Sequence, residues 1–347
     1  METLLTEFRK RCQDAVLDLL WRQWCSLGVS GHAPPADQTR LIDLEALVLA
    51  TTSLGRQDPR LFDEAFDWLA SFGSLINLQR LANLHRIHPL GDSRVLIAIA
   101  DWLLNKASQP RWKAIVKGEQ IGNEIPLETL FHSAQGQVLK ISDEIFQARG
   151  LVRSVFQPRR MSRAFQPLLA SNLTPALRAL IGVSARVEIL LYLSGSQTAA
   201  RGTDIARATG YAPRTLQAVL QEMLLSGHLL SQEPPSRKDT VRRTQGRYHL
   251  QPSDWTFLTS GKPLPRWTPW ASIFTLARNV LAAIPEKEAK PIHPAVISSR
   301  LRETLITEGP YLAATGLLPS LDLRPEAPGS ELLQTLASRL PDLINSL

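Results

Sequence analysis

Apolar residues recur at intervals of three and four along the first hundred residues. The repeat runs through residues 1–33, through Leu41–Leu54 and from Leu61 to Leu69, which is the period of amphipathic helices. Asp58-Pro59 supplies an N-cap and a first-turn proline for the third of these. Helices over Leu75–Ile87 and Asp92–Ala107 continue the pattern. We therefore predict an N-terminal helical domain over residues 1–107.

The helical pair within residues 58–87 permits two interpretations. Phe72-Gly73-Ser74 makes a tight turn between its helices, and polar residues that include Asn77 and Arg80 are expected to be exposed on the second helix. The pair is either a second helix-turn-helix or a hairpin of the scaffold. His85 and His88 follow at a spacing compatible with metal binding, but no third ligand accompanies them and we predict no metal site.

Residues 108–171 break the helical pattern and are predicted to be a linker with a basic arm. Prolines and glycines interrupt this region, and only Ala114–Val116 and Gln137–Ile141 have the composition of strands. The arm carries Arg153, Arg159, Arg160 and Arg163 among apolar residues. It is either a solvated connector or a segment that follows a phosphate backbone.

Residues 172–258 combine three short helical patterns with a basic hairpin. In the first helix, Ala185–Leu193, Arg186 and Glu188 are expected to face outward. Thr203 is the expected N-cap of the second helix, which should end at Gly210, where glycine tolerates the left-handed conformation. Pro213 suits the first turn of the third helix. One face of that helix has an apolar stripe at helical spacing, formed by Leu216, Val219, Leu220, Met223 and Leu224.

This region resembles the winged helix-turn-helix of bacterial transcriptional regulators of the MarR and ArsR groups. The resemblance is carried by Ala206, Gly210 and the pair Leu216 and Val219. Ser226–Leu230 resembles the exit from the recognition helix into the first wing strand, and Arg247–Leu250 resembles the returning strand. It covers about a fifth of the chain. It implies a mainly α protein in which a winged helix-turn-helix domain, with a small β-hairpin, is flanked by N-terminal and C-terminal helical regions.

The resemblance also implies a DNA-binding site. Its recognition helix would present Arg214, Thr215, Gln217 and Gln221 to the major groove, where such side chains reach bases and phosphates. The wing would grip phosphates or the minor groove with Arg237, Lys238, Arg242, Arg243 and Arg247. The expected partner is double-stranded DNA, bound by a homodimer that reads two half-sites. A repressor of transcription is the expected role, with its effector unknown.

The C-terminal helical region, residues 259–347, has helical patterns after a segment rich in proline and tryptophan. Its helices are expected over Trp270–Ile284, from Pro294 to about Thr307, and over Glu331–Leu340. This region is a helical cap on the core, a dimer arm or a regulatory domain, and the pattern does not separate these roles.

Charge is distributed unevenly along the chain. The formal net charge of +7 arises mainly between Arg149 and Leu250, where 15 Lys/Arg oppose 5 Asp/Glu for a net charge of +10. Residues 1–148 have 15 basic and 18 acidic residues, a net of −3. A concentrated basic segment favours a phosphate backbone as partner.

Several function classes lack their signatures. The chain has no phosphate-binding loop, no G-x-S-x-G motif and no cysteine pair with zinc spacing, so we predict no cofactor and no enzymatic activity. No apolar run is long enough for a membrane span, and Cys12 and Cys25 suit a reducing cytoplasm. Two rival functions stay open: a helical protein-interaction scaffold, and a nucleic-acid-positioning accessory of an enzyme system.

Overall fold

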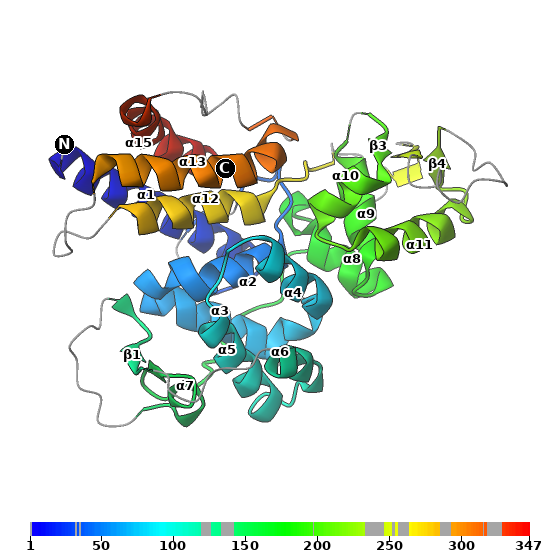
Figure 1. Cartoon of the computed structure of the whole chain (residues 1–347). Coiled ribbons are helices and arrows are strands. Elements are labelled where there is room, and N and C mark those ends of the chain that lie inside the picture. Colours follow the sequence, from blue (N-terminus) through cyan, green and yellow to red (C-terminus); the bar gives the residue numbers. More distant parts are fainter. Residues whose placement is uncertain are drawn as a thin grey trace.

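The computed structural model of the chain is mainly helical, with two small sheets (Figure 1). It describes residues 2–31, 33–34, 36–118, 126–132, 142–196, 198–232, 246–251, 254–255, 264–284, 293–314, 316–317 and 328–347. The predicted strand Gln137–Ile141 and the wing residues Arg237, Lys238, Arg242 and Arg243 lie outside these ranges. No helix among the described residues is long and apolar enough to cross a membrane.

The N-terminal helices follow the predicted order. They are α1 (Glu2–Ser26), α2 (Leu44–Ser53), η1 (Leu54–Gln57), α3 (Pro59–Phe72), η2 (Gly73–Leu75), α4 (Leu78–Ile87), α5 (Ser93–Asn105), η3 (Pro110–Trp112) and α6 (Lys113–Gly118). Side-chain caps fix several starts: Asp58 accepts from the backbone N–H groups of Arg60 and Leu61, as expected for its position before Pro59. Ala114–Val116 lies in α6 rather than in a strand, because Trp112 and Ile115 are buried in the helical core.

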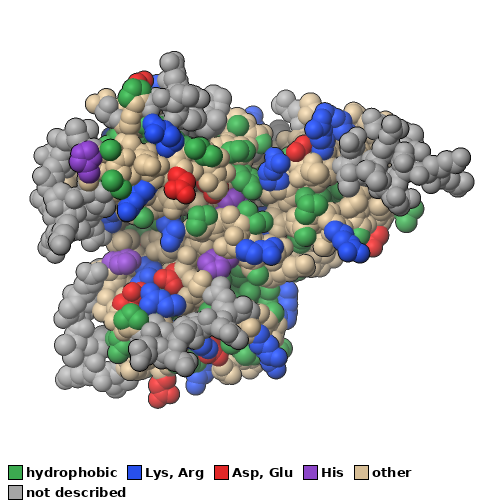
Figure 2. Space-filling model, in the orientation of Figure 1, with side chains coloured by type: hydrophobic (Ala, Val, Ile, Leu, Met, Phe, Trp, Pro, Cys, Tyr) green, Lys and Arg blue, Asp and Glu red, His purple; other side chains and the backbone are tan. Residues whose placement is uncertain are grey.

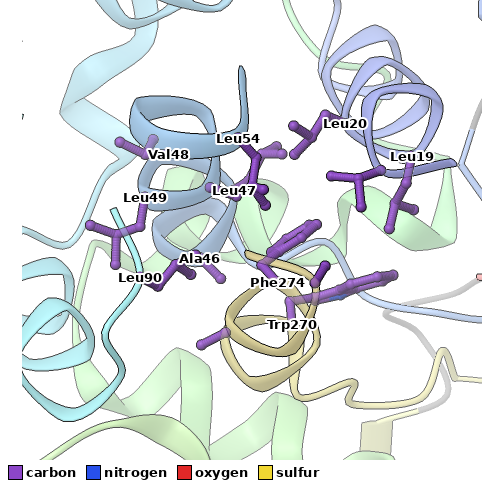
Figure 3. Packing of buried hydrophobic residues seen from close by; sticks show 14 of the residues in the cluster. Leu19, Leu20, Ala46, Leu47, Val48, Leu49, Leu54, Leu90, Trp270 and Phe274 are labelled. Carbon is purple, nitrogen blue, oxygen red and sulfur yellow. The ribbon is translucent and has the colours of Figure 1, made fainter. Parts of the chain in front are cut away.

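The C-terminal helices share their core with the N-terminal ones. They are α12 (Trp270–Ala283), α13 (Pro294–Ala314) and α15 (Gly329–Ser346). Figure 3 shows Trp270 and Phe274 of α12 between Leu47 of α2 and Leu19 of α1. The described helices of residues 1–107 and 259–347, which the sequence pattern separates, therefore form one helical body around one hydrophobic core.

Residues 126–132 and 142–169 pack against this helical body. Strands β1 (Glu128–Thr129) and β2 (Leu151–Val152) pair in parallel, and α7 (Glu144–Gln147) lies between them in sequence. Residues 153–169, called the connector below, then run along α3. The backbone N–H groups of Arg160, Met161 and Ser162 all donate to the carboxylate of Asp67.

The docking of the connector corrects the interpretation of its arginines. Arg153 is 2% exposed; it pairs with Asp63 at 2.9 Å and lies over the rings of three phenylalanines. Arg159 pairs with Glu64 at 2.8 Å. Arg153 is therefore unavailable to a phosphate backbone. Glu64 and Asp67 of α3, which bind the connector, are themselves buried.

The described residues between 185 and 250, called the central module below, form a separate small core. Helix α8 (Leu173–Ile181) precedes it, after η5 (Ala170–Asn172). Its elements are α9 (Ala185–Ser194), β3 (Ala200–Arg201), α10 (Gly202–Thr209), α11 (Pro213–Leu224), β4 (Leu229–Ser231) and β5 (Arg247–Leu250). The strands form an antiparallel sheet in the order β3-β5-β4. Strand β5 has the predicted bounds, whereas β4 begins at Leu229, inside the predicted segment Ser226–Leu230.

Local sequence explains most boundaries in the central module. Gly210 ends α10 at φ 76°, in the left-handed conformation expected there, and Pro213 is in the first turn of α11. Leu216 and Leu220 are fully buried against α9 and α10, whereas Val219 is half-buried. Thr203 is not the N-cap of α10, because the helix begins one residue before it, at Gly202.

Candidate nucleic-acid interface

Helix α11 presents its first turn to solvent. Arg214 and Thr215 are exposed there, opposite the buried stripe that contains Leu216 and Leu220. Arg214 makes no hydrogen bond or ion pair with any residue that the structure describes. The guanidinium is therefore open to an external acceptor, and it adds its charge to the positive end of the helix dipole.

The two glutamines predicted on α11 are less accessible than the first turn. Gln217 is half-buried, and its Nε2 donates to the Oη atom of Tyr248 on β5 at 3.1 Å. Gln221 is also half-buried. The amide of Gln217 thus ties α11 to the sheet, and base contact by this donor requires the bond to Tyr248 to break.

Of the five predicted wing residues, Arg247 is the one within the described ranges. It is exposed on β5, opposite Arg201 of β3, and it donates to the carbonyl of Ala199 at 3.2 Å. Arg201 and Arg207 of α10 are exposed as well, although the sequence argument did not assign them a role. Their position could have indicated a role, because Arg201 directly precedes the first helix of the predicted pair and Arg207 lies within it.

The basic charge of the segment from Arg149 to Leu250 is smaller at the surface than in the sequence. Arg149, Arg153, Arg159 and Arg178 pair with carboxylates of residues 1–148. Between Ser184 and Leu250 nine Lys/Arg oppose five Asp/Glu, a net charge of +4. Figure 2 shows several Lys and Arg side chains on the visible face of the central module and fewer Asp and Glu.

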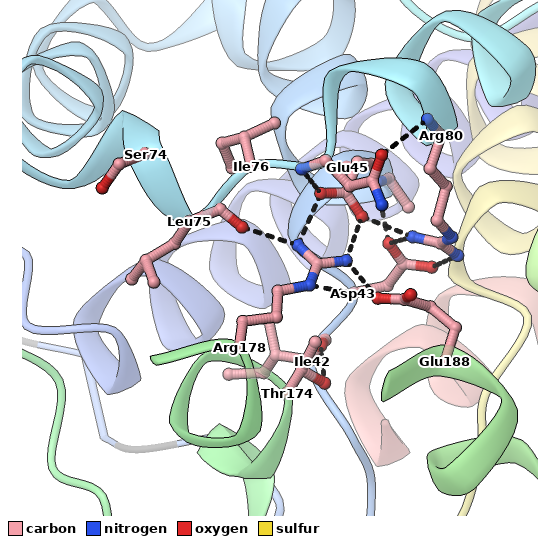
Figure 4. Close-up of polar contacts among 12 residues, drawn as sticks. Ile42, Asp43, Glu45, Ser74, Leu75, Ile76, Arg80, Thr174, Arg178 and Glu188 are labelled. Atoms are coloured by element: carbon pink, nitrogen blue, oxygen red, sulfur yellow. Dashed lines mark hydrogen bonds and ion pairs between the residues drawn. The ribbon is translucent and has the colours of Figure 1, made fainter. Parts of the chain in front are cut away.

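A buried network of charges holds the central module against the helical body (Figure 4). Arg178 of α8 donates to both carboxylate oxygens of Glu45 on α2, at 2.6 and 2.8 Å, and also bonds Glu188 of α9. Arg80 of α4 bonds Glu45 at 2.6 Å and Asp43 with both terminal nitrogens. These five side chains are called the junction network below, and each is less than a tenth exposed.

The junction network reaches the turn between α10 and α11. Arg80 Nε donates to the carbonyl of Thr209 at 2.7 Å. Tyr211 Oη donates to Glu188 at 3.2 Å and accepts from Asn77 Nδ2. Three groups therefore fix the position of α11 relative to the helical body: the carbonyl of Thr209 and the hydroxyl of Tyr211, both in the turn before α11, and the carboxylate of Glu188 on α9.

Opposite charges keep the junction network ionised despite its burial. Burial raises the pKa of Asp43 and of Glu45, but Arg80 and Arg178 outweigh that effect and hold both pKa values below their usual range. The pKa of Tyr211 is raised by burial and by the nearby carboxylate of Glu188, so its phenol stays protonated and able to donate.

Sequence reasoning missed this network. Asn77 and Arg80 were expected on an exposed face of α4, and Glu188 on an exposed face of α9, but all three are buried. Glu188 lies between Val187 and Ile189 in a run of large apolar residues, and a charge in such a run was the available signal. On α4, Arg80 and Leu84 face the turn at Gly210, so this part of the helix is covered by the central module.

Comparisons of the chain with protein-family models, with curated proteins and with solved structures find no match. Among the described residues no group of three or more His, Cys, Asp and Glu side chains could hold a metal ion.

Proposed function

We propose that the protein is a sequence-specific DNA-binding transcriptional regulator whose central module acts as a winged helix-turn-helix. The observation that carries the proposal is the element order helix, strand, helix, helix, strand, strand, with the exposed Arg214 and Thr215 at the start of α11. In helix-turn-helix proteins the first turn of the second helix of the pair reaches base edges in the major groove.

In this proposal α11 is the recognition helix. Arg214 donates to the O6 and N7 atoms of a guanine, the commonest specific contact of an arginine in the major groove. Arg247 binds a phosphate from the sheet, together with the wing residues outside the described ranges. Two copies of the chain read two half-sites about 34 Å apart, and occupation of such a site excludes polymerase, which makes the protein a repressor.

A binding titration tests this proposal with matched charge changes. A preferred site is first selected from random duplexes, and fluorescence anisotropy then measures affinity for that site and for a scrambled duplex at two salt concentrations. Arg214→Ala should weaken the preferred site by about 1–3 kcal/mol and reduce discrimination between duplexes. Arg247→Ala should weaken both duplexes alike and reduce the salt slope by about one.

Lys113→Ala removes the same unit charge from the exposed face of α6, far from α11 (Figure 1), and should leave both affinities unchanged. Equal losses for Lys113→Ala and Arg214→Ala would mean that binding responds to net charge alone. Selection that enriches no sequence would refute the proposal.

A second candidate function is docking of another protein on the central module. Leu225, directly after α11, is 88% exposed, and Leu230 on β4 is 36% exposed. Glu222 near the end of α11 is acidic and pairs with Arg186 of α9, so this end of the helix suits a protein partner better than a phosphate backbone. Leu225→Ser should leave DNA affinity unchanged and abolish capture of such a partner.

A further inference from the structure

A cavity of about 340 Å³ opens between α12 and α13. Its lining combines aliphatic and polar side chains: Pro89, Asn279, Ala282, Ala283, Arg300, Glu303, Thr304, Thr307 and Glu308. The volume falls in the range of small-molecule sites. Two carboxylates and one guanidinium give the lining a formal charge of −1.

Glu308 is the buried acid of this cavity. Its side chain is 1% exposed, and one carboxylate oxygen, Oε2, lies 3.0 Å from Nδ1 of His88. The other oxygen, Oε1, is buried and accepts no hydrogen bond from any described residue. A buried carboxylate oxygen without a donor costs folding free energy. This atom therefore marks a place where an external donor would be stabilised.

The remaining polar groups of the cavity divide into occupied and open ones. Asn279 Nδ2 donates to Thr304 Oγ1, and the hydroxyl groups of Thr304 and Thr307 donate to carbonyls of their own helix. The side chains of Arg300 and Glu303 are exposed and make no hydrogen bond or ion pair with any described residue. Arg300 precedes Glu308 by eight residues, or about 12 Å along a helix.

We propose that this cavity binds a free basic amino acid, such as lysine, ornithine or arginine. The terminal cationic group of its side chain donates to Oε1 of Glu308, its carboxylate pairs with Arg300, and its α-ammonium group lies beside Glu303. The net charge of +1 on such a ligand complements the −1 of the lining. Its extended side chain places cation and carboxylate at opposite ends, which suits an acid and a base that lie eight residues apart on α13.

The cavity is joined to the junction network through α4, so on the proposed function of DNA binding the amino acid is the effector. His88, the partner of Glu308, is the C-cap of α4. The same helix carries Arg80, whose Nε bonds the carbonyl of Thr209 at the end of α10. A ligand cation on Oε1 would share the Glu308 carboxylate with His88, and any shift of α4 acts directly on the turn before α11.

Calorimetry without DNA tests the site separately from the proposed function. L-lysine, L-ornithine and L-arginine are titrated into the full-length protein, beside L-norleucine, which lacks the side-chain cation, and 1,5-diaminopentane, which lacks the carboxylate. At least one basic amino acid should bind, and both truncated probes should bind about 10- to 100-fold more weakly. Failure of all three basic amino acids to bind overturns the proposal.

Three variants locate the binding. Glu308→Gln and Thr307→Trp, which fills the mouth of the cavity, should each reduce affinity at least tenfold. Ile306→Trp adds the same ring to the neighbouring residue, which is 65% exposed and does not line the cavity, and should bind as the parent does. Unchanged affinity in Thr307→Trp places the ligand elsewhere and overturns the proposal even where Glu308→Gln fails to fold.

A final arm adds the selected duplex. If the amino acid binds but no duplex does, the proposal of an amino-acid site is supported and the proposal of DNA binding is refuted. A change in duplex affinity with the bound amino acid, lost in Thr307→Trp, supports both.

Discussion

Removal of Arg178 should be among the most damaging single substitutions in this protein. Its guanidinium makes four hydrogen bonds to two carboxylates and one to the carbonyl of Leu75. Arg178→Ala leaves Glu188 with Tyr211 as its hydrogen-bond partner and Glu45 with one arginine in place of two. Removal of one partner from a buried ion pair typically costs about 3–5 kcal/mol.

That loss is a large part of the 5–15 kcal/mol that stabilises an ordinary domain. Urea unfolding followed by tryptophan fluorescence measures it. Because Arg178 joins the central module to the helical body, its loss should also split the transition, with the module undocking at lower urea. Arg178→Lys keeps the charge but not the forked geometry, so its free energy of unfolding should lie between that of the parent protein and that of Arg178→Ala.

The control is another arginine–glutamate pair of the same module. Arg186 and Glu222 are about half exposed, at 49% and 57%, and an exposed pair contributes about 0–1 kcal/mol. Arg186→Ala should therefore reduce stability by less than about 1 kcal/mol. Equal and small losses for Arg178→Ala and Arg186→Ala would refute the reasoning, because they would mean that water reaches the junction network.

Three further predictions concern pH, the turn and the connector. The folded pKa values of Asp43 and Glu45 lie below their unfolded values of about 3.9 and 4.3. The stability that these two carboxylates contribute is therefore complete above the unfolded values and is lost as pH falls through the folded pKa. The melting temperature should drop below about pH 4, and it should drop less steeply in Glu45→Gln. Gly210→Ala should destabilise the module by more than about 1 kcal/mol in thermal melts, because Gly210 has φ 76° and an added Cβ would lie 2.7 Å from Leu84. The control is Gly227→Ala, which has φ 75° and nothing within 4 Å of the added Cβ, so its loss of stability measures the backbone strain alone. Asp67→Ala should release the connector, seen as faster limited proteolysis after Arg159 or Arg160, whereas Asp18→Ala on α1 should not change the cleavage rate.

Helix positions were predictable from the sequence because capping and periodicity are local. Asp58-Pro59 at the start of α3 and Gly210 at the end of α10 lie where their chemistry places them. Thr203 misled the prediction because Gly202 already adopts the helical conformation after β3, without a side-chain cap. The hairpin strands were recognisable because they alternate, with Tyr248 and Leu250 buried and Arg247 exposed.

Tertiary pairing of charges could not be predicted in the same way. Glu64 and Asp67 look solvated on an isolated α3, and their burial depends on a connector some 90 residues later in the chain. The charge count of the basic segment did not predict its surface charge for the same reason, because four of its arginines pair with carboxylates in the acidic N-terminal region. A segment count of charge thus overstates the positive potential available to a phosphate backbone.

The junction network gives orientation more than stability. Burial of ion pairs is costly, and apolar replacements of similar volume often stabilise a protein as well or better. The apolar contact beside it is small, with a core of Leu41, Leu173, Leu177, Val187 and Leu191, and such a contact tolerates rotation. The forked hydrogen bonds from Arg178 and Arg80 do not tolerate rotation, because a displaced guanidinium leaves a buried carboxylate unpaired. On the proposed function this rigidity has a use: two α11 helices in a dimer match half-sites about 34 Å apart only where each module keeps one angle to the helical body.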